Sequence, residues 1–188
     1  MMYTDSEHVS HPRRQLTRFG PVGQALLMTD GTLTLLLGHF AGERIIVDRL
    51  AQHVISGTAA PQGPLPPAKG PVLVRDVDLA GEHSARTYVR ARSITRLEAI
   101  PTAMGEELLT SRTPLGVLLN KYGLGVFRRP LGIHEGSPLD EGEVSWTSRS
   151  SLLSVGRSPA ISLVEAFPDN VLLDLDAAVR DTRGGDIQ

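Results

Sequence analysis

Two stretches of the chain alternate apolar and polar residues in the way that half-buried strands do, and each carries one charge among its apolar residues. The apolar face of 72–79 comprises Leu73, Arg75, Val77 and Leu79, and that of 161–167 comprises Ile161, Leu163, Glu165 and Phe167. Side chains two positions apart share a face of a strand. The pattern therefore predicts that Arg75 and Glu165 point toward the core.

These two inward charges allow two interpretations. An ionised side chain in an apolar interior is costly unless something pairs with it. Arg75 and Glu165 either meet as a buried ion pair, or they line an internal cavity that holds a polar ligand.

The same hydrophobic pattern predicts the remaining elements. Helices are expected at 22–28, after a cap at Thr32, at 101–109, and after a cap at Thr113 with Pro114 in the first helical position. Strands are expected at 43–55 with a bulge, and at 71–79, 85–94, 125–132, 144–155 and 159–167. Strands joined by hairpins, with the helices grouped in two blocks, predict an α+β fold built on an antiparallel sheet.

Length and composition fit a single domain. A chain of 188 residues can bury most of its apolar surface in one core. We expect the folded domain at 16–175, between polar tails at 1–15 and 176–188.

The charge balance narrows the kind of partner. With 19 basic and 21 acidic residues, the formal net charge is −2. This charge does not indicate binding to nucleic acid or to an anionic membrane. There is no cysteine, no basic-then-apolar signal segment at the start, and no apolar run long enough to span a bilayer. We therefore expect a cytoplasmic protein that acts on a small molecule, as a monomer or weak dimer.

Familiar catalytic motifs are missing from the chain. It contains no G-x-G-x-x-G, Walker loop, G-x-S-x-G or H-E-x-x-H, and its six histidines are scattered singly. The sequence thus favours neither metal catalysis nor serine hydrolysis.

The predicted helix starts are candidates for anion binding. The N–H groups of Leu33 and Leu115 fall in first turns, where they lack partners within the helix and carry positive partial charge. Each start alone is an ordinary helix cap. Together with an inward Arg75, the two could form a pocket for one carboxylate. Arg92 is a candidate for a second substrate charge.

Five short segments together resemble the chorismate–pyruvate lyase family. They are Asp30-Gly31-Thr32-Leu33-Thr34, Arg75-Asp76-Val77, Arg92-Ser93-Ile94, Thr113-Pro114-Leu115-Gly116 and Val164-Glu165-Ala166-Phe167. Each segment alone is weak, whereas the five in this order and spacing are fairly specific. The resemblance implies an α+β fold with an antiparallel sheet, in which helical flaps enclose the ligand.

The resemblance also implies a reaction and roles for particular residues. The reaction is conversion of chorismate to 4-hydroxybenzoate and pyruvate, without metal or cofactor. Arg75 and the N–H groups of Leu33 and Leu115 would hold the ring carboxylate, and Glu165 would contact the ring hydroxyl. Arg92 would help with the enolpyruvyl carboxylate. Arg75 and Glu165 are thus the expected catalytic residues.

The chain departs from the family pattern in two places. Where an arginine cluster is common, 146–151 holds only Arg149, and a common tryptophan is replaced by Tyr88. Two alternatives to the lyase therefore stay open: a related protein with altered chemistry on a cyclic or aromatic acid, and a non-catalytic domain that binds aromatic acids.

Overall fold

We analysed a computed structural model, which describes residues 16–61, 63–137, 139 and 144–184. The tail predicted at 1–15 lies outside the described residues, as does the end of the chain after Gly184. Six strands form one antiparallel sheet in the order β1-β2-β3-β6-β5-β4. Their bounds are β1 Ile45–Ser56, β2 Pro71–Gly81, β3 Thr87–Arg96, β4 Val126–Glu135, β5 Trp146–Val155 and β6 Ser158–Pro168.

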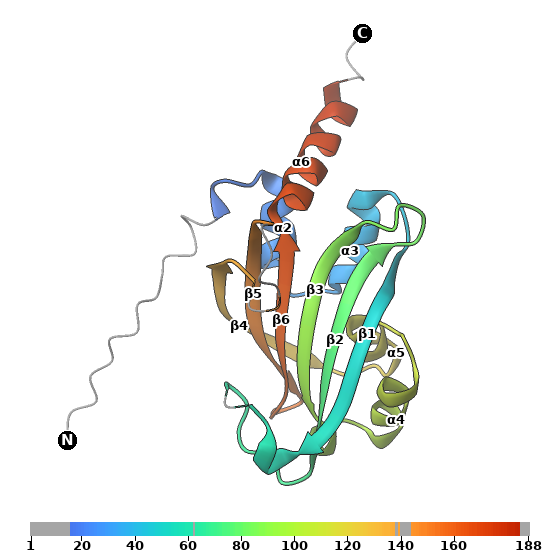
Figure 1. Ribbon diagram of the computed structural model, residues 1–188, viewed down its shortest axis with the longest axis vertical. Coiled ribbons are helices and arrows are strands. Elements are labelled where there is room, and N and C mark those ends of the chain that lie inside the picture. The colour runs from blue at the N-terminus through green and yellow to red at the C-terminus, as the bar shows by residue number, and fades with distance from the viewer. Residues whose placement is uncertain (1–15, 62, 138, 140–143, 185–188) are drawn as a thin grey trace, which may run out of the picture.

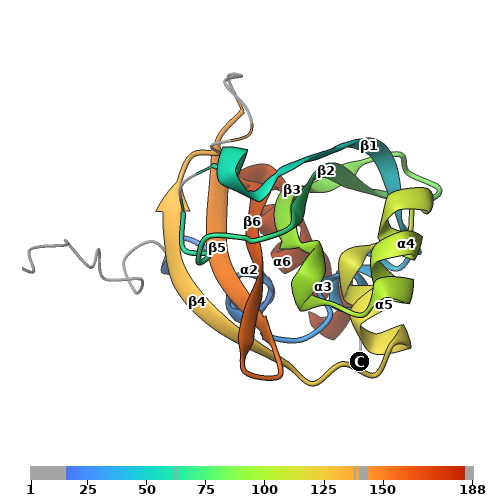
Figure 2. The ribbon, with the colours of Figure 1, turned by 90° about the horizontal axis from the view of Figure 1, so that it is seen from below.

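The sheet confirms the predicted α+β class and all six predicted strands. The bulge expected in the first strand is present as a register shift between Val47 and Arg49 in the β1–β2 pairing. The strands form a curved sheet rather than a flat one, as Figure 2 shows. Right-handed strand twist accumulates across six strands and produces such curvature.

Helices gather in two groups at the two ends of the strands (Figure 1). Toward one end lie α2 (Pro21–Met28), α3 (Leu33–Ala41) and α6 (Asp169–Gly184), and toward the other lie α4 (Thr102–Thr110) and α5 (Leu115–Lys121). Two short 3-10 turns, Gly57–Ala59 and Leu97–Ala99, end β1 and β3. None of the helices in the described part of the chain is long and apolar enough to cross a membrane.

The core fills the space between the inner face of the sheet and these helices. Its fully buried side chains come from the helices and from four strands. They include Leu26, Leu37, Met104, Leu118 and Leu172 from the helices, and Leu73, Val89, Leu153, Ile161 and Phe167 from the strands. The face of β2 and β6 that the sequence predicted as apolar is therefore the core face.

The structure corrects the predicted end of the domain. Residue 176 was expected to begin a tail, but it lies inside α6, which is 16 residues long. Val171, Leu172 and Leu175 are buried, and this helical spacing of apolar residues anchors α6 to the core. The polar residues interleaved among them hid the pattern.

The start of α5 also differs from the prediction. Pro114 takes the cap position with φ −57° and ψ 140°, and the helix begins at Leu115 rather than at Pro114. Thr113 does not serve as the cap: its N–H donates to the Ser111 hydroxyl, and its carbonyl accepts from Arg75.

Asp176 ties α6 to α2, which lies more than 150 residues earlier in the chain. Its carboxylate is 2% exposed and accepts the N–H groups of Gly20 at 2.7 Å, Val22 at 2.8 Å and Gly23 at 3.3 Å. Gly20 is the cap residue of α2 and has no side chain to do this. A carboxylate at a helix start satisfies orphan donors and complements the helix dipole.

We expect Asp176→Asn to lower the free energy of unfolding by about 1–3 kcal/mol, because two buried donors and one part-buried donor lose a charged acceptor. Chemical denaturation of the two proteins measures this. Asp174→Asn is the matched control, since Asp174 lies on the same helix, is 61% exposed and pairs with Arg86. An equal effect of the two substitutions would contradict the capping role.

Candidate functional site

A cavity of about 210 Å³ lies between the inner face of the sheet and the starts of α3 and α5. Apolar side chains form most of its wall: Leu33, Val77, Leu79, Ala91, Leu115, Leu119, Leu124, Val126, Leu153 and Leu163. Arg75, Arg128 and Glu165 are its buried or nearly buried charges. The exposed residues Asp30, Gly31 and Asn120 mark its mouth. Since a cavity of about 150 Å³ can hold benzene, this one has room for a substituted six-membered ring.

Strand register brings Arg75 and Glu165 to this cavity without bringing them into contact. Arg75 pairs with Ser93 on β3, and Ser93 pairs with Leu163 on β6, two residues before Glu165. Their backbones are thus separated by ~10 Å across the strands and ~7 Å along them. Each side chain has other partners, so the direct ion pair is not formed and the structure agrees with the cavity alternative.

Arg75 is a buried cation with unused donors. Its side chain is nearly inaccessible, at 2% exposure of the residue, and its Nη2 donates to the carbonyls of Ser111 and Thr113 at 3.1 Å each. Its Nε and Nη1 are buried and have no acceptor among the described residues. Burial lowers the pKa of the guanidinium below its ordinary value. A cation in this state is expected to attract an anion into the cavity.

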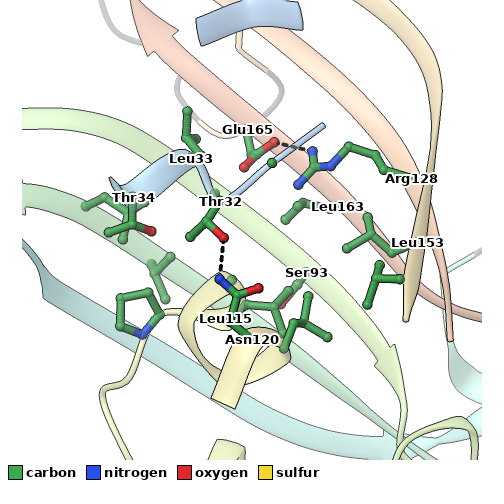
Figure 3. A pocket seen from close by; sticks show the side chains of 18 of the residues that line it. Thr32, Leu33, Thr34, Ser93, Leu115, Asn120, Arg128, Leu153, Leu163 and Glu165 are labelled. Atoms are coloured by element: carbon green, nitrogen blue, oxygen red, sulfur yellow. Dashed lines mark hydrogen bonds and ion pairs between the residues drawn. The ribbon is translucent and has the colours of Figure 1, made fainter. Parts of the chain in front are cut away.

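Glu165 is the centre of a buried cluster that the sequence did not predict. Its Oε2 accepts Nε of Arg149 at 2.7 Å and Nη1 of Arg128 at 2.9 Å. Figure 3 shows the contact with Arg128 at the cavity wall. Burial by itself raises the pKa of the Glu165 carboxyl, but the two arginines outweigh it and hold the pKa below the ordinary value. Glu165 is therefore ionised at neutral pH.

Arg149 and Arg75 each anchor a loop that leads into a helix of the cavity wall. Nη1 of Arg149 donates to the carbonyl of Leu26, in the last turn of α2, and to that of Thr29, in the loop that leads to α3, at 2.8 Å each. Arg75 does the same for the residues before α5. The predicted helix starts are consequently held against the sheet, and both Leu33 and Leu115 line the cavity (Figure 3).

A side-chain hydrogen bond joins the two helix starts at the mouth. Nδ2 of Asn120 on α5 donates to the Thr32 hydroxyl at 2.7 Å (Figure 3). Thr32 is the cap residue of α3, as predicted, but its side chain bonds to Asn120 instead of capping its own helix.

Arg92 lies outside the cavity. It points to the opposite face of the sheet from its neighbours Ala91 and Ser93, which line the cavity. Its Nε and Nη2 donate to the two carboxylate oxygens of Asp76. The hydrogen bonds with Asp76 raise the pKa of Arg92. The expected contact with a second substrate charge is therefore not supported at Arg92, because alternation along β3 turns this side chain away.

Arg128 and Arg149 are the charged residues of the site that the sequence reading missed. Arg128 shares a strand face with Val126, and Arg149 shares one with Thr147 and Ser151. This alternation was a usable signal, but the pairing of Arg149 with Glu165 depends on the β5–β6 register.

The donors of the cavity suit an anion. Guanidinium and backbone N–H groups bind carboxylates, and they are not metal ligands. Within the described residues, no three His, Asp or Glu side chains gather closely enough to hold a metal ion.

Comparison with known proteins gives one partial likeness in sequence. No family model matches the chain. The chain is 35% identical over 96 residues to a curated protein named chorismate pyruvate-lyase, from Mycobacterium leprae (strain TN). The matched part covers 50% of this chain and 45% of that protein, so the chain spans less than half of the relative's length.

Solved structures give weaker likenesses. PhnF from Mycobacterium smegmatis has a TM-score of 0.49 and 9% identity, covering 76% of this chain and 66% of that chain. A ligand-binding domain assigned to the GntR family of transcriptional regulators, from Bordetella bronchiseptica, has a TM-score of 0.38 and 13% identity, covering 66% and 89%.

Proposed function

We propose that the protein is a chorismate lyase, which converts chorismate to 4-hydroxybenzoate and pyruvate without a cofactor. The observation that carries this proposal is Arg75, a buried guanidinium with two nitrogens that have no acceptor in the described part of the chain. It lines a cavity that Glu165 also lines. The partial sequence likeness to a chorismate pyruvate-lyase supports the same reaction.

In this proposal the ring carboxylate lies against Arg75. The Nε and Nη1 groups of Arg75 donate charge-assisted hydrogen bonds to this carboxylate. The N–H groups of Leu33 and Leu115 donate to its remaining lone pairs. The apolar wall encloses the ring and keeps water away from it.

The chemistry needs no nucleophile. In one cyclic step, the hydrogen on ring carbon 4 moves to the methylene carbon of the enolpyruvyl group, and the bond from ring carbon 3 to the ether oxygen breaks. That oxygen becomes the keto oxygen of pyruvate, while the ring becomes aromatic. Atoms and electrons balance within the substrate itself. The cavity has only to hold the reactive conformer and exclude water.

The surroundings of Glu165 favour a positioning role over that of a base. A carboxylate whose pKa is lowered by two arginines accepts a proton poorly. It remains a good hydrogen-bond acceptor, so we assign it to the ring hydroxyl. This assignment is consistent with the cyclic step, in which no protein group gains or loses a proton.

Incubating the purified protein with chorismate tests the proposal. We expect equal amounts of pyruvate and 4-hydroxybenzoate to form, well above the spontaneous rate in buffer. No excess over that rate would rule out the lyase. A different hydroxybenzoate isomer, identified by mass and retention time, would indicate altered chemistry. A rise in melting temperature with 4-hydroxybenzoate, but no turnover, would indicate a binding domain.

A further inference from the structure

The buried charges around the cavity do not balance. Among the described residues, three buried or nearly buried arginines (Arg75, Arg128 and Arg149) lie at or next to the cavity with one buried carboxylate, Glu165, so two positive charges are in excess. Asp30 at the mouth is exposed, and solvent screens it. A ligand with one carboxylate at Arg75 would remove only one of the two excess charges. Because uncompensated buried charge is costly, the site should favour a second anionic group.

We propose that Arg128 binds this second anionic group and thereby makes the site selective for dicarboxylates over monocarboxylates. The inference rests on the proposed function of the cavity and identifies a specificity residue for it. Arg128 thus takes the role that was expected of Arg92, whose guanidinium binds Asp76 on the other face of the sheet.

Arg128 and Arg75 reach the cavity from strands that lie far apart in the sheet. It lies on β4 and Arg75 lies on β2, with β3, β6 and β5 between them in the curved sheet. Both side chains nevertheless line the same cavity. A ligand that touches both must therefore carry its two charges on separate parts of the molecule.

The bonds of Arg128 leave part of its guanidinium for a ligand. Arg128 makes two hydrogen bonds to described residues, and both come from Nη1. One goes to Glu165 Oε2 at 2.9 Å and the other to the Ser151 hydroxyl at 3.2 Å. Nε and Nη2 take part in neither bond. Figure 3 shows the guanidinium beside Glu165 at the wall of the cavity.

Arg149 cannot take this role, although it contacts the same carboxylate oxygen. It is 4% exposed, its Nε binds Glu165, and its Nη1 binds the carbonyls of Leu26 and Thr29. It does not line the cavity. Arg149 holds Glu165 in place, whereas Arg128 faces the ligand.

A pair of stable ligands that differ by one carboxylate tests the assignment. They are 4-hydroxy-3-methoxybenzoate and 3-(carboxymethoxy)-4-hydroxybenzoate, neither of which carries an enolpyruvyl group to eliminate. Calorimetry would measure both with wild-type protein and with Arg128→Gln. We expect the substitution to weaken the dicarboxylate by about tenfold or more, the size of a lost charge-assisted bond, and to change the monocarboxylate by less than about threefold.

Two further variants test whether the effect is specific to position 128 and to its charge. Arg129→Gln is the matched control, because the neighbouring side chain is exposed on the other side of β4, and both affinities should stay at wild-type values. Arg128→Lys keeps the charge and should retain most of the preference for the dicarboxylate.

Equal weakening of both ligands by Arg128→Gln would overturn the assignment alone, since it would mean that Arg128 acts only by supporting Glu165. Failure of wild-type protein to bind either ligand would overturn the proposed function together with it. A preference for the dicarboxylate that disappears only in Arg128→Gln supports the proposal.

Discussion

Replacing Arg75 with methionine is expected to remove carboxylate binding without unfolding the protein. A carboxylate that enters the cavity would then be buried without its counter-ion, which costs on the order of 3–5 kcal/mol, or more than a hundredfold in affinity. The empty protein should be as stable as wild type or more stable. Methionine has a similar volume and no charge to desolvate, and this offsets the loss of the bonds to Ser111 and Thr113.

Thermal shift with 4-hydroxybenzoate measures both parts of this prediction. Wild-type protein should gain melting temperature as the ligand is added, whereas Arg75→Met should not. Arg92→Met is the matched control. It removes an arginine from the adjacent strand, but on the outer face, so ligand stabilisation should persist. A normal ligand response in Arg75→Met would mean that the carboxylate pocket is assigned to the wrong residue.

Glu165→Gln is expected to destabilise the protein by about 3 kcal/mol or more and to reduce turnover of chorismate. The substitution keeps the size of the side chain but leaves Arg149 and Arg128, which are 4% and 11% exposed at their side chains, without a counter-charge. The ring hydroxyl would also lose its charged acceptor. Denaturation curves and product formation measure the two effects separately.

The lowered pKa of Glu165 determines how the stability difference between wild type and Glu165→Gln depends on pH. A carboxyl group whose pKa is lower in the folded state contributes stability that is fully present above its ordinary value of 4.5. That contribution is lost as pH falls below 4.5 through the lowered pKa. The stability gap between wild type and Glu165→Gln should therefore be constant near neutral pH and shrink in acid.

Glu106→Gln provides the control, since Glu106 is an exposed carboxylate on α4. We expect a change within about 0.5 kcal/mol, as for most surface substitutions. A stability gap for Glu165→Gln that does not narrow in acid would contradict the ion-pair role of this carboxylate.

Features that depend on neighbouring residues could be predicted from the sequence. Alternation within single strands predicted that Arg75 and Glu165 point inward, and both are buried. Alternation also puts Arg92 on the face opposite Ser93, so its exposure was predictable, although Arg92 was expected to meet a second substrate charge. The helix at 169–184 was missed because its apolar residues are interrupted by acidic ones.

Features that join distant segments could not be predicted in this way. Asp176 caps a helix more than 150 residues away, and Arg149 meets both Glu165 and the end of α2. No local pattern specifies such contacts, because they depend on how strands pair and on which helix packs against which face.

The sequence by itself therefore determined that this protein carries two charges on the apolar faces of its strands, since the side-chain period of a strand is a local property. Only the tertiary structure decided what those charges do. The strand order and register separate Arg75 from Glu165, give Glu165 two arginine partners, and leave two buried nitrogens of Arg75 without an acceptor among the described residues. The physical reason is that the interaction between two charges depends on their distance in the folded protein, and not on their separation along the chain.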